Sequence, residues 1–169
     1  LFVNDGSGNF TQNTSNTFLS RMQSTKLVDL DNDGYVDIVS SGYSNGVGSG
    51  TDFYKNTGGM NFNTAVSIST YGGEIGLIDV NNDNAMDMII GGTDNTTSNK
   101  AVDVFLNNGS AVLTAVAGNA FGEYNDVYFT VNDFDADGDK DLTLVGWESV
   151  GSGHVAKQFI NNGSGVMTQ

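Results

Sequence analysis

The apolar residues of this chain occur in short runs that are separated by polar, turn-forming residues. Typical runs lie at 26–28, 36–39, 88–90 and 142–145. Many of their residues are β-branched, and clusters of Gly, Asn and Asp, which readily adopt the positive φ angles of tight turns, bound them. No stretch of about twelve residues has the i, i+3, i+4, i+7 apolar spacing of an amphipathic helix. The pattern therefore predicts an all-β fold.

Two motifs recur along the chain with a shared period. One is an Asn-x-Gly motif, found as Phe-Val-Asn-Asp-Gly at 2–6, Tyr-Lys-Asn-Thr-Gly at 54–58, Phe-Leu-Asn-Asn-Gly at 105–109 and Phe-Ile-Asn-Asn-Gly at 159–163. The other is a nine-residue Asp motif, found at 29–37, 79–87 and 133–141. Because two independent motifs recur about every 50 residues, the chain is built from repeats.

Each repeat is expected to contain four strands, which in the first repeat lie near 25–28, 36–41, 52–56 and 61–68. Repeated four-stranded units predict a β-propeller-like array of about three blades, which is a partial or open propeller because a closed ring takes about four. Residues 1–169 are expected to form one repeat domain, with the end of a preceding blade at 1–23 and blades at 24–70, 71–118 and 119–169, the last strand being incomplete. Since 1–12 and 158–169 are the same part of the repeat, we expect a segment of a longer array, or a protomer whose blade a neighbouring chain completes.

The Asp motifs have the composition of calcium loops. Twelve of the seventeen Asp residues lie in these three motifs, and Ca²⁺ prefers about six to eight oxygen ligands. The predicted side-chain ligands are Asp29, Asp31, Asp33 and Asp37, then Asp79, Asn81, Asp83 and Asp87, then Asp133, Asp135, Asp137 and Asp141; the predicted carbonyl ligands are those of Tyr35, Ala85 and Asp139. Up to three Ca²⁺ ions are expected, and the second site, with three carboxylates, should be the weakest.

Two alternatives to a calcium loop fit the Asp motifs less well. An EF-hand needs Glu at its twelfth position, where this chain has Ser40, Ile90 and Leu144, and its flanks would be helical rather than strand-like. The Asp residues could also merely cap turns, but three loops in register favour a shared cation-binding role. Gly34 and Gly138 supply the sharp turn, and Asn84, which also tolerates left-handed backbone, replaces them in the second loop.

The segment 27–38 and the segment 2–10, with their copies, resemble the FG-GAP or VCBS-type repeats of integrin-like β-propellers over essentially the whole chain. This resemblance implies four-stranded blades with Ca²⁺ in the hairpin between the first two strands. It also implies an extracellular setting, either secreted or on the cell surface, where abundant calcium fills weak sites.

Charge and composition exclude several functions. With 6 Lys and Arg against 20 Asp and Glu, the net charge of −14 disfavours binding to nucleic acid or an anionic membrane. Cysteine is absent, no apolar run is long enough to insert into a membrane, and no acid, base and nucleophile are placed together by a motif. The chain is therefore expected not to be an enzyme.

The sequence thus predicts a non-enzymatic, calcium-binding segment of an extracellular protein with an adhesion or scaffold role. Its expected partners are other chains or further repeats of the same chain. One alternative is a structural protomer of an extracellular filament or assembly, joined by strand complementation. A third is a carbohydrate-binding appendage of a secreted enzyme, because Tyr43 and Trp147 occupy equivalent positions where they would either stack on a glycan or cover their own blades.

Overall fold

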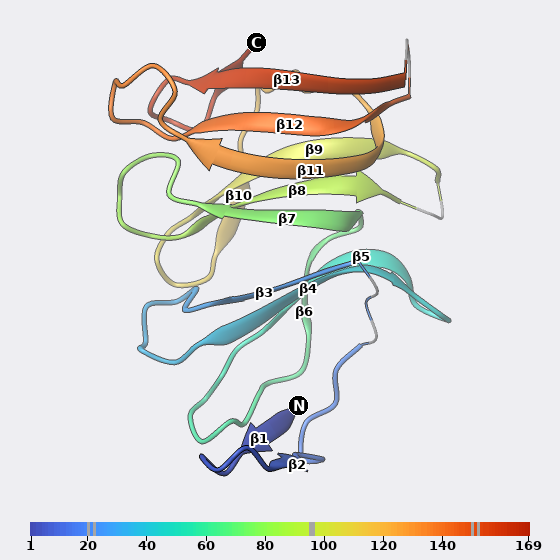
Figure 1. The fold of residues 1–169 in the computed structure, drawn as a ribbon, viewed down its shortest axis with the longest axis vertical. Helices are drawn as coiled ribbons and strands as arrows, with labels where there is room; N and C mark the ends of the chain where they lie inside the picture. Colours follow the sequence, from blue (N-terminus) through green and yellow to red (C-terminus); the bar gives the residue numbers. More distant parts are fainter. Residues whose placement is uncertain (20, 22, 95–96, 150, 152) are drawn as a thin grey trace.

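The described residues form strands and no helix (Figure 1). The computed structural model describes residues 1–169 except 20, 22, 95–96, 150 and 152. A two-stranded sheet contains β1 (Phe2–Asn4) and β2 (Phe10–Gln12). The first four-stranded sheet contains β3 (Ser24–Val28), β4 (Asp37–Ser44), β5 (Gly48–Tyr54) and β6 (Val66–Ser69); the second contains β7 (Gly72–Ile78), β8 (Asp87–Thr93), β9 (Lys100–Asn107) and β10 (Leu113–Ala115); the third contains β11 (Tyr124–Asn132), β12 (Asp141–Glu148), β13 (Gly153–Asn161) and β14 (Met167–Thr168). No helix in this part of the chain is long and apolar enough to cross a membrane.

Each four-stranded sheet is an antiparallel meander in which consecutive strands are neighbours. The three sheets stack on one another in chain order, with the β1–β2 hairpin below the first (Figure 1). The all-β prediction and the repeated four-stranded unit are therefore confirmed. The strands of the described ranges do not close into a ring.

The first sheet differs from the expected strand positions on its outer side. β5 begins at Gly48 rather than near 52, because the glycine-rich segment pairs with the end of β4, Gly50 opposite Gly42 and Gly48 opposite Ser44. β6 begins only at Val66, because the turn after β5 is closed by an isolated bridge between Asn56 and Phe62. Small residues thus make β5 longer than expected, and the turn at Asn56–Phe62 makes β6 shorter.

The hydrophobic residues form two cores, one on each side of the middle sheet. The core between the first and second sheets contains Leu30, Val39, Phe53, Ile75, Met88 and Ile90. The core between the second and third contains Ile78, Val80, Ile89, Val102, Val104, Phe121, Tyr124, Val127, Leu142, Leu144, Phe159 and Met167. In β8, Met88 and Ile90 enter the first core and Ile89 enters the second, as alternate residues of a strand face opposite sides. The middle sheet is therefore buried on both faces.

The outer face of the third sheet is open, whereas Phe18 and Leu19 cover the outer face of the first sheet at Tyr54 and leave only part of it exposed. Leu27 on β3 is exposed on the first sheet, and Val145 and Trp147 on β12 are exposed on the third. Apolar side chains are therefore exposed on the outer faces of the first and third sheets. The core residues of the middle sheet are instead buried against its two neighbours.

Candidate metal centres

Each Asp motif forms the loop between the first two strands of its sheet, and its backbone turns through two residues with positive φ. The first is Asn32, Asn82 or Ala136, and the second is Gly34, Asn84 or Gly138. The left-handed backbone expected at Asn84 is confirmed, with φ of 67°. The earlier left-handed position was not predicted, although the Asn at two of its three occurrences is the residue that most readily adopts it after Gly.

The first Asp of each motif closes its own loop. Asp29 accepts hydrogen bonds from the N–H groups of Asp33 at 3.1 Å and Gly34 at 2.8 Å. Asp79 accepts two equivalent bonds, and Asp133 accepts one from Gly138. The loop therefore wraps around this side chain, which accepts backbone N–H groups four and five residues further on.

The last Asp of each motif is fully buried and joins the two sequence motifs. One oxygen of Asp141 accepts the N–H of Phe134 at 2.8 Å, within the Asp loop, and the other accepts the N–H of Asn161 at 2.9 Å, in the Asn-x-Gly turn. Asp37 and Asp87 make the same two bonds in their own sheets. Sequence reasoning assigned these residues only as metal ligands and missed this link.

The Asn of the turn then reaches the preceding sheet. The amide of Asn107 donates to the carbonyl of Leu30 at 2.7 Å, and that of Asn161 donates to the carbonyl of Val80 at 2.7 Å, and both bonds are buried. Leu30 and Val80 are the second residues of their Asp motifs. The Asn turn of one sheet therefore holds the Asp loop of the sheet before it, which explains why the two motifs share one period.

Two of the three Asp loops gather carboxylates into a triad. One carboxylate oxygen from each of three residues lies within 4.8 Å of the others. The first triad is Asp29, Asp31 and Asp37, and the third-loop triad is Asp133, Asp135 and Asp141. Each triad therefore offers three carboxylate oxygens, which are the hard, negatively charged ligands that suit a divalent cation.

The other predicted side-chain ligands are not in these triads. Asp33 and Asp137 accept the N–H groups of Tyr35 and Asp139 two residues on, at 2.9 and 2.8 Å. In the second loop, which is described throughout, no triad of carboxylates forms. There the Asn81 amide donates to Asp83 at 2.9 Å.

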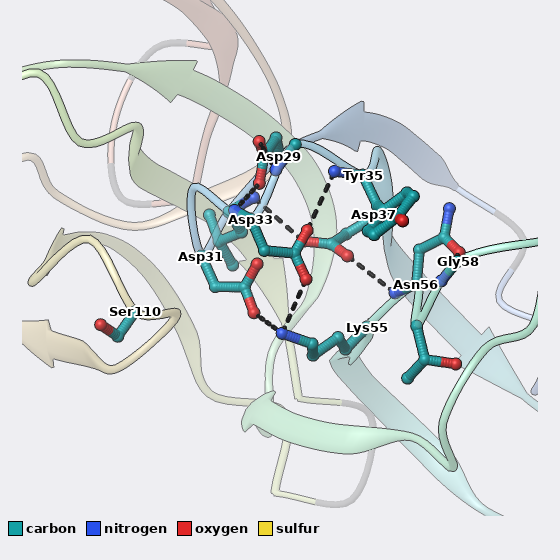
Figure 2. A network of polar contacts seen from close by, with 12 residues as sticks. Asp29, Asp31, Asp33, Tyr35, Asp37, Lys55, Asn56, Gly58 and Ser110 are labelled. Carbon is teal, nitrogen blue, oxygen red and sulfur yellow. Dashed lines mark hydrogen bonds and ion pairs between the residues drawn. The ribbon is translucent and has the colours of Figure 1, made fainter.

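Each triad contains a buried oxygen that lacks a hydrogen-bond donor. The two atoms are Oδ1 of Asp31 and Oδ1 of Asp133. The side chain of Asp31 is only 10% exposed, and Figure 2 shows this oxygen directed toward the middle of the loop. An unsatisfied buried carboxylate oxygen is costly, so both triads fit a bound cation.

Burial and like charge make the carboxyl groups of Asp37 and Asp87 hard to ionise. Burial raises the pKa of Asp37 above the ordinary value for Asp, and the neighbouring carboxylates of Asp31 and Asp33 add to the rise, while backbone N–H donors oppose it. The pKa of Asp87 is raised in the same way, by burial and by Asp79 and Asp83. A divalent cation would relieve this repulsion.

A lysine reaches into the first loop. The Nζ of Lys55 forms ion pairs with Asp31 and, at 2.9 Å, with Asp33 (Figure 2). These carboxylates raise the pKa of Lys55. Sequence reasoning missed this residue. The signal that could have found it is its charge, because the other repeats have the apolar residues Leu106 and Ile160 at the equivalent position.

The two aromatic residues considered for glycan stacking do not meet. Tyr43 lies on β4 and Trp147 on β12, and the second sheet separates these two strands (Figure 1). The Trp147 ring instead packs edge-on against His154 of the neighbouring strand, with 4.7 Å between ring centroids. A stacking surface shared by Tyr43 and Trp147 is therefore not formed.

Comparison of the chain with protein-family models, with curated proteins and with solved structures gives no match. The resemblance to FG-GAP and VCBS repeats therefore depends on the two motifs themselves.

The link between sheets is tested by Asn161→Ala. This change leaves the buried Val80 carbonyl without its donor and should lower the free energy of unfolding by about 1–3 kcal/mol in urea. The matched control is Asn4→Ala, because Asn4 has the same place in its motif and accepts the same turn N–H groups, from Gly6 and Gly8, but is exposed. Equal losses in both variants would contradict a stabilising role for the bond to Val80.

Proposed function

We propose that the chain is a calcium-binding segment of an extracellular, β-propeller-like repeat protein of the FG-GAP/VCBS type, with a non-enzymatic adhesion or scaffold role. In this proposal the ion has a structural task. It offsets the repulsion between the carboxylates of one Asp loop and fixes that loop between the first two strands of its blade.

The observation that carries the proposal is the pair of equivalent Asp triads, each with a buried oxygen that lacks a donor. The donor set also favours calcium over softer metals. The triads consist of carboxylates alone, without His or Cys, and oxygen-only sites suit Ca²⁺ or Mg²⁺ rather than Zn²⁺ or Cu²⁺. Ca²⁺ accepts irregular coordination geometry, whereas Mg²⁺ demands a near-ideal octahedron, so a short loop with several carboxylates favours Ca²⁺.

The residues expected to hold the ions follow from the loops. In the first loop they are Asp29, Asp31 and Asp37, with the carbonyl of Tyr35; in the third they are Asp133, Asp135 and Asp141, with the carbonyl of Asp139. The second loop offers Asp79, Asn81, Asp83, Asp87 and the carbonyl of Ala85, and it should bind most weakly because no carboxylate triad forms there.

Hydrogen bonds would carry the effect of an ion beyond its loop. Asp141 belongs to the third triad and also holds the N–H of Asn161, whose amide holds the second Asp loop at Val80. An ion that orders Asp141 thus supports the contact between two sheets. Sites of modest affinity would serve this purpose outside the cell, where calcium modules have dissociation constants of about 10⁻⁴–10⁻³ M.

Exposed apolar residues on the outer faces of the first and third sheets support the propeller-like part of the proposal. Leu27 at one end and Val145 and Trp147 at the other are exposed apolar residues on sheet faces. Sheets in such arrays are stabilised by stacking on neighbours. Further blades, from the same chain or from another chain, are the partners that would cover these faces.

A specific observation favours a second function, as a protomer joined to its neighbours by strand complementation. The β1–β2 hairpin carries the Asn-x-Gly motif of the outer half of a blade, yet it forms a sheet of only two strands with Phe2 and Phe10 exposed. Exposed strand edges accept strands from other chains.

Calcium removal tests the main proposal. Saturating Ca²⁺ at about 100 times its dissociation constant should add about 2.7 kcal/mol per site, so EDTA should lower the melting temperature by roughly 5–10 °C for each occupied site in a chain of this size. The Asp135→Asn variant should show a smaller shift, because its third site is weakened before chelation. A wild-type melting temperature that is the same in Ca²⁺ and in EDTA would refute the proposal.

The ranking of the loops is a separate prediction. Asp135 belongs to a triad and Asp83 does not, so Asp135→Ala should remove more calcium binding than Asp83→Ala in isothermal titration calorimetry. Greater loss in Asp83→Ala would contradict the ligand sets given above.

Strand complementation is tested by sedimentation velocity over a range of protein concentrations. If it occurs, the wild-type chain forms oligomers and a variant that lacks residues 1–12 does not. A wild-type chain that stays monomeric throughout, or oligomers that persist without residues 1–12, would remove this second function.

A further inference from the structure

One of the three Asp loops contains a cation supplied by the chain itself. Lys55 follows the last residue of β5, and its Nζ pairs with Asp31 and Asp33 of the first loop (Figure 2). Leu106 and Ile160, at the equivalent positions of the other repeats, cannot do this. The first repeat therefore differs from its copies at the centre of the loop.

We propose that Lys55 is a tethered counter-ion that competes with calcium for the first Asp loop. It holds this loop together when calcium is scarce and weakens calcium binding when calcium is present. This inference rests on the proposed function and adds a regulation of the same site, so that the repeats respond to calcium in a graded way.

The position of Asp31 makes the competition direct. One oxygen of Asp31 pairs with Lys55, and the other is the buried oxygen without a donor in the first triad. The lysine and a calcium ion would therefore share this carboxylate. Two positive charges on one buried carboxylate repel each other, so each binds more weakly when the other is in place.

The lysine can also withdraw from the loop. Its side chain is 34% exposed, whereas that of Asp31 is 10% exposed. A partly exposed ammonium on a flexible four-carbon stem regains water readily. A calcium ion can therefore displace it without leaving a buried unpaired charge.

The third loop is the natural contrast. Its motif has five Asp residues, and in the described part of the chain no salt bridge reaches its triad. Without calcium its repulsion is not offset by a lysine, and with calcium nothing competes. On falling calcium, the first repeat should keep its structure longest and the third should be the most dependent on the ion.

Terbium luminescence can report on the first loop alone. Tb³⁺ binds oxygen sites built for Ca²⁺, and its emission is sensitised by a nearby tyrosine. Tyr35 is such a residue in the first loop, where the other loops have Ala85 and Asp139. Subtracting the signal of Tyr35→Phe removes any contribution from more distant tyrosines.

The test compares Lys55→Met with Lys26→Met. Lys26 is a matched control, because it is 35% exposed and pairs with a carboxylate, Glu74, outside the Asp loops. Lys55→Met should tighten Tb³⁺ binding at the first loop roughly tenfold, as expected when about 1.4 kcal/mol of competition is removed. In EDTA the same variant should melt below the wild type, while Lys26→Met should leave Tb³⁺ binding unchanged.

Each outcome has one meaning. If Tb³⁺ binds the wild type and Lys55→Met equally well, the competition is refuted and the calcium function stands. If neither protein shows Tyr35-sensitised emission, the first loop is no cation site and the proposed function fails there. Tighter binding in Lys26→Met as well would show a general charge effect and overturn the inference.

A transplanted lysine keeps the test decisive if Lys55→Met does not fold. Ile160→Lys places an ammonium beside the third triad, at the position that Lys55 has in the first repeat. It should weaken the calcium affinity of the third loop roughly tenfold and raise the melting temperature in EDTA. Unchanged affinity and unchanged melting would overturn the inference.

Discussion

Like charges held close together are the constraint on which this structure depends. The first and third Asp loops each bring three carboxylates together, and one member of each triad is fully buried. Burial and neighbouring carboxylates raise the pKa of Asp37, so the folded loop stores an electrostatic cost. The chain itself offsets this repulsion in two ways, with backbone N–H donors in all three loops and with a lysine in the first loop. A bound divalent ion would offset it in a third way.

The backbone compensation is also what joins the repeats. Because Asp87 holds the N–H of Asn107, and the Asn107 amide holds the carbonyl of Leu30, one carboxylate connects its own sheet to the previous one. The same relay runs through Asp141 and Asn161 to Val80. The Asp motif and the Asn-x-Gly motif are therefore two halves of one contact, and a change in either affects the packing of neighbouring sheets.

Features that depend on neighbouring residues could be predicted from the sequence, whereas contacts between sheets could not. Strand and turn positions follow from neighbouring residues, so the all-β fold, the four-stranded repeat and the left-handed backbone at Asn84 could be predicted. The second role of Asp141 could not, because it depends on a turn that is twenty residues away. The separation of Tyr43 from Trp147 likewise results from the stacking of sheets rather than from spacing in the chain.

Lys55 falls between these two cases. The sequence shows that Lys55 is unusual, since the other repeats have apolar residues at its position in the motif. Its ion pairs with the first Asp loop could not be predicted, because they depend on the pairing that brings the end of β5 beside that loop. A charged residue that breaks an otherwise apolar repeat position points to a difference between sites that are equivalent in every other respect.

The most direct measurement is anomalous X-ray diffraction from crystals of this chain grown in calcium and collected at a long wavelength. Calcium that neutralises the gathered carboxylates should give anomalous peaks between Asp133, Asp135 and Asp141 and between Asp29, Asp31 and Asp37, with the stronger peak at the third loop. Asp triads that keep their geometry in calcium without any anomalous peak would contradict the claim that a divalent ion holds these loops together.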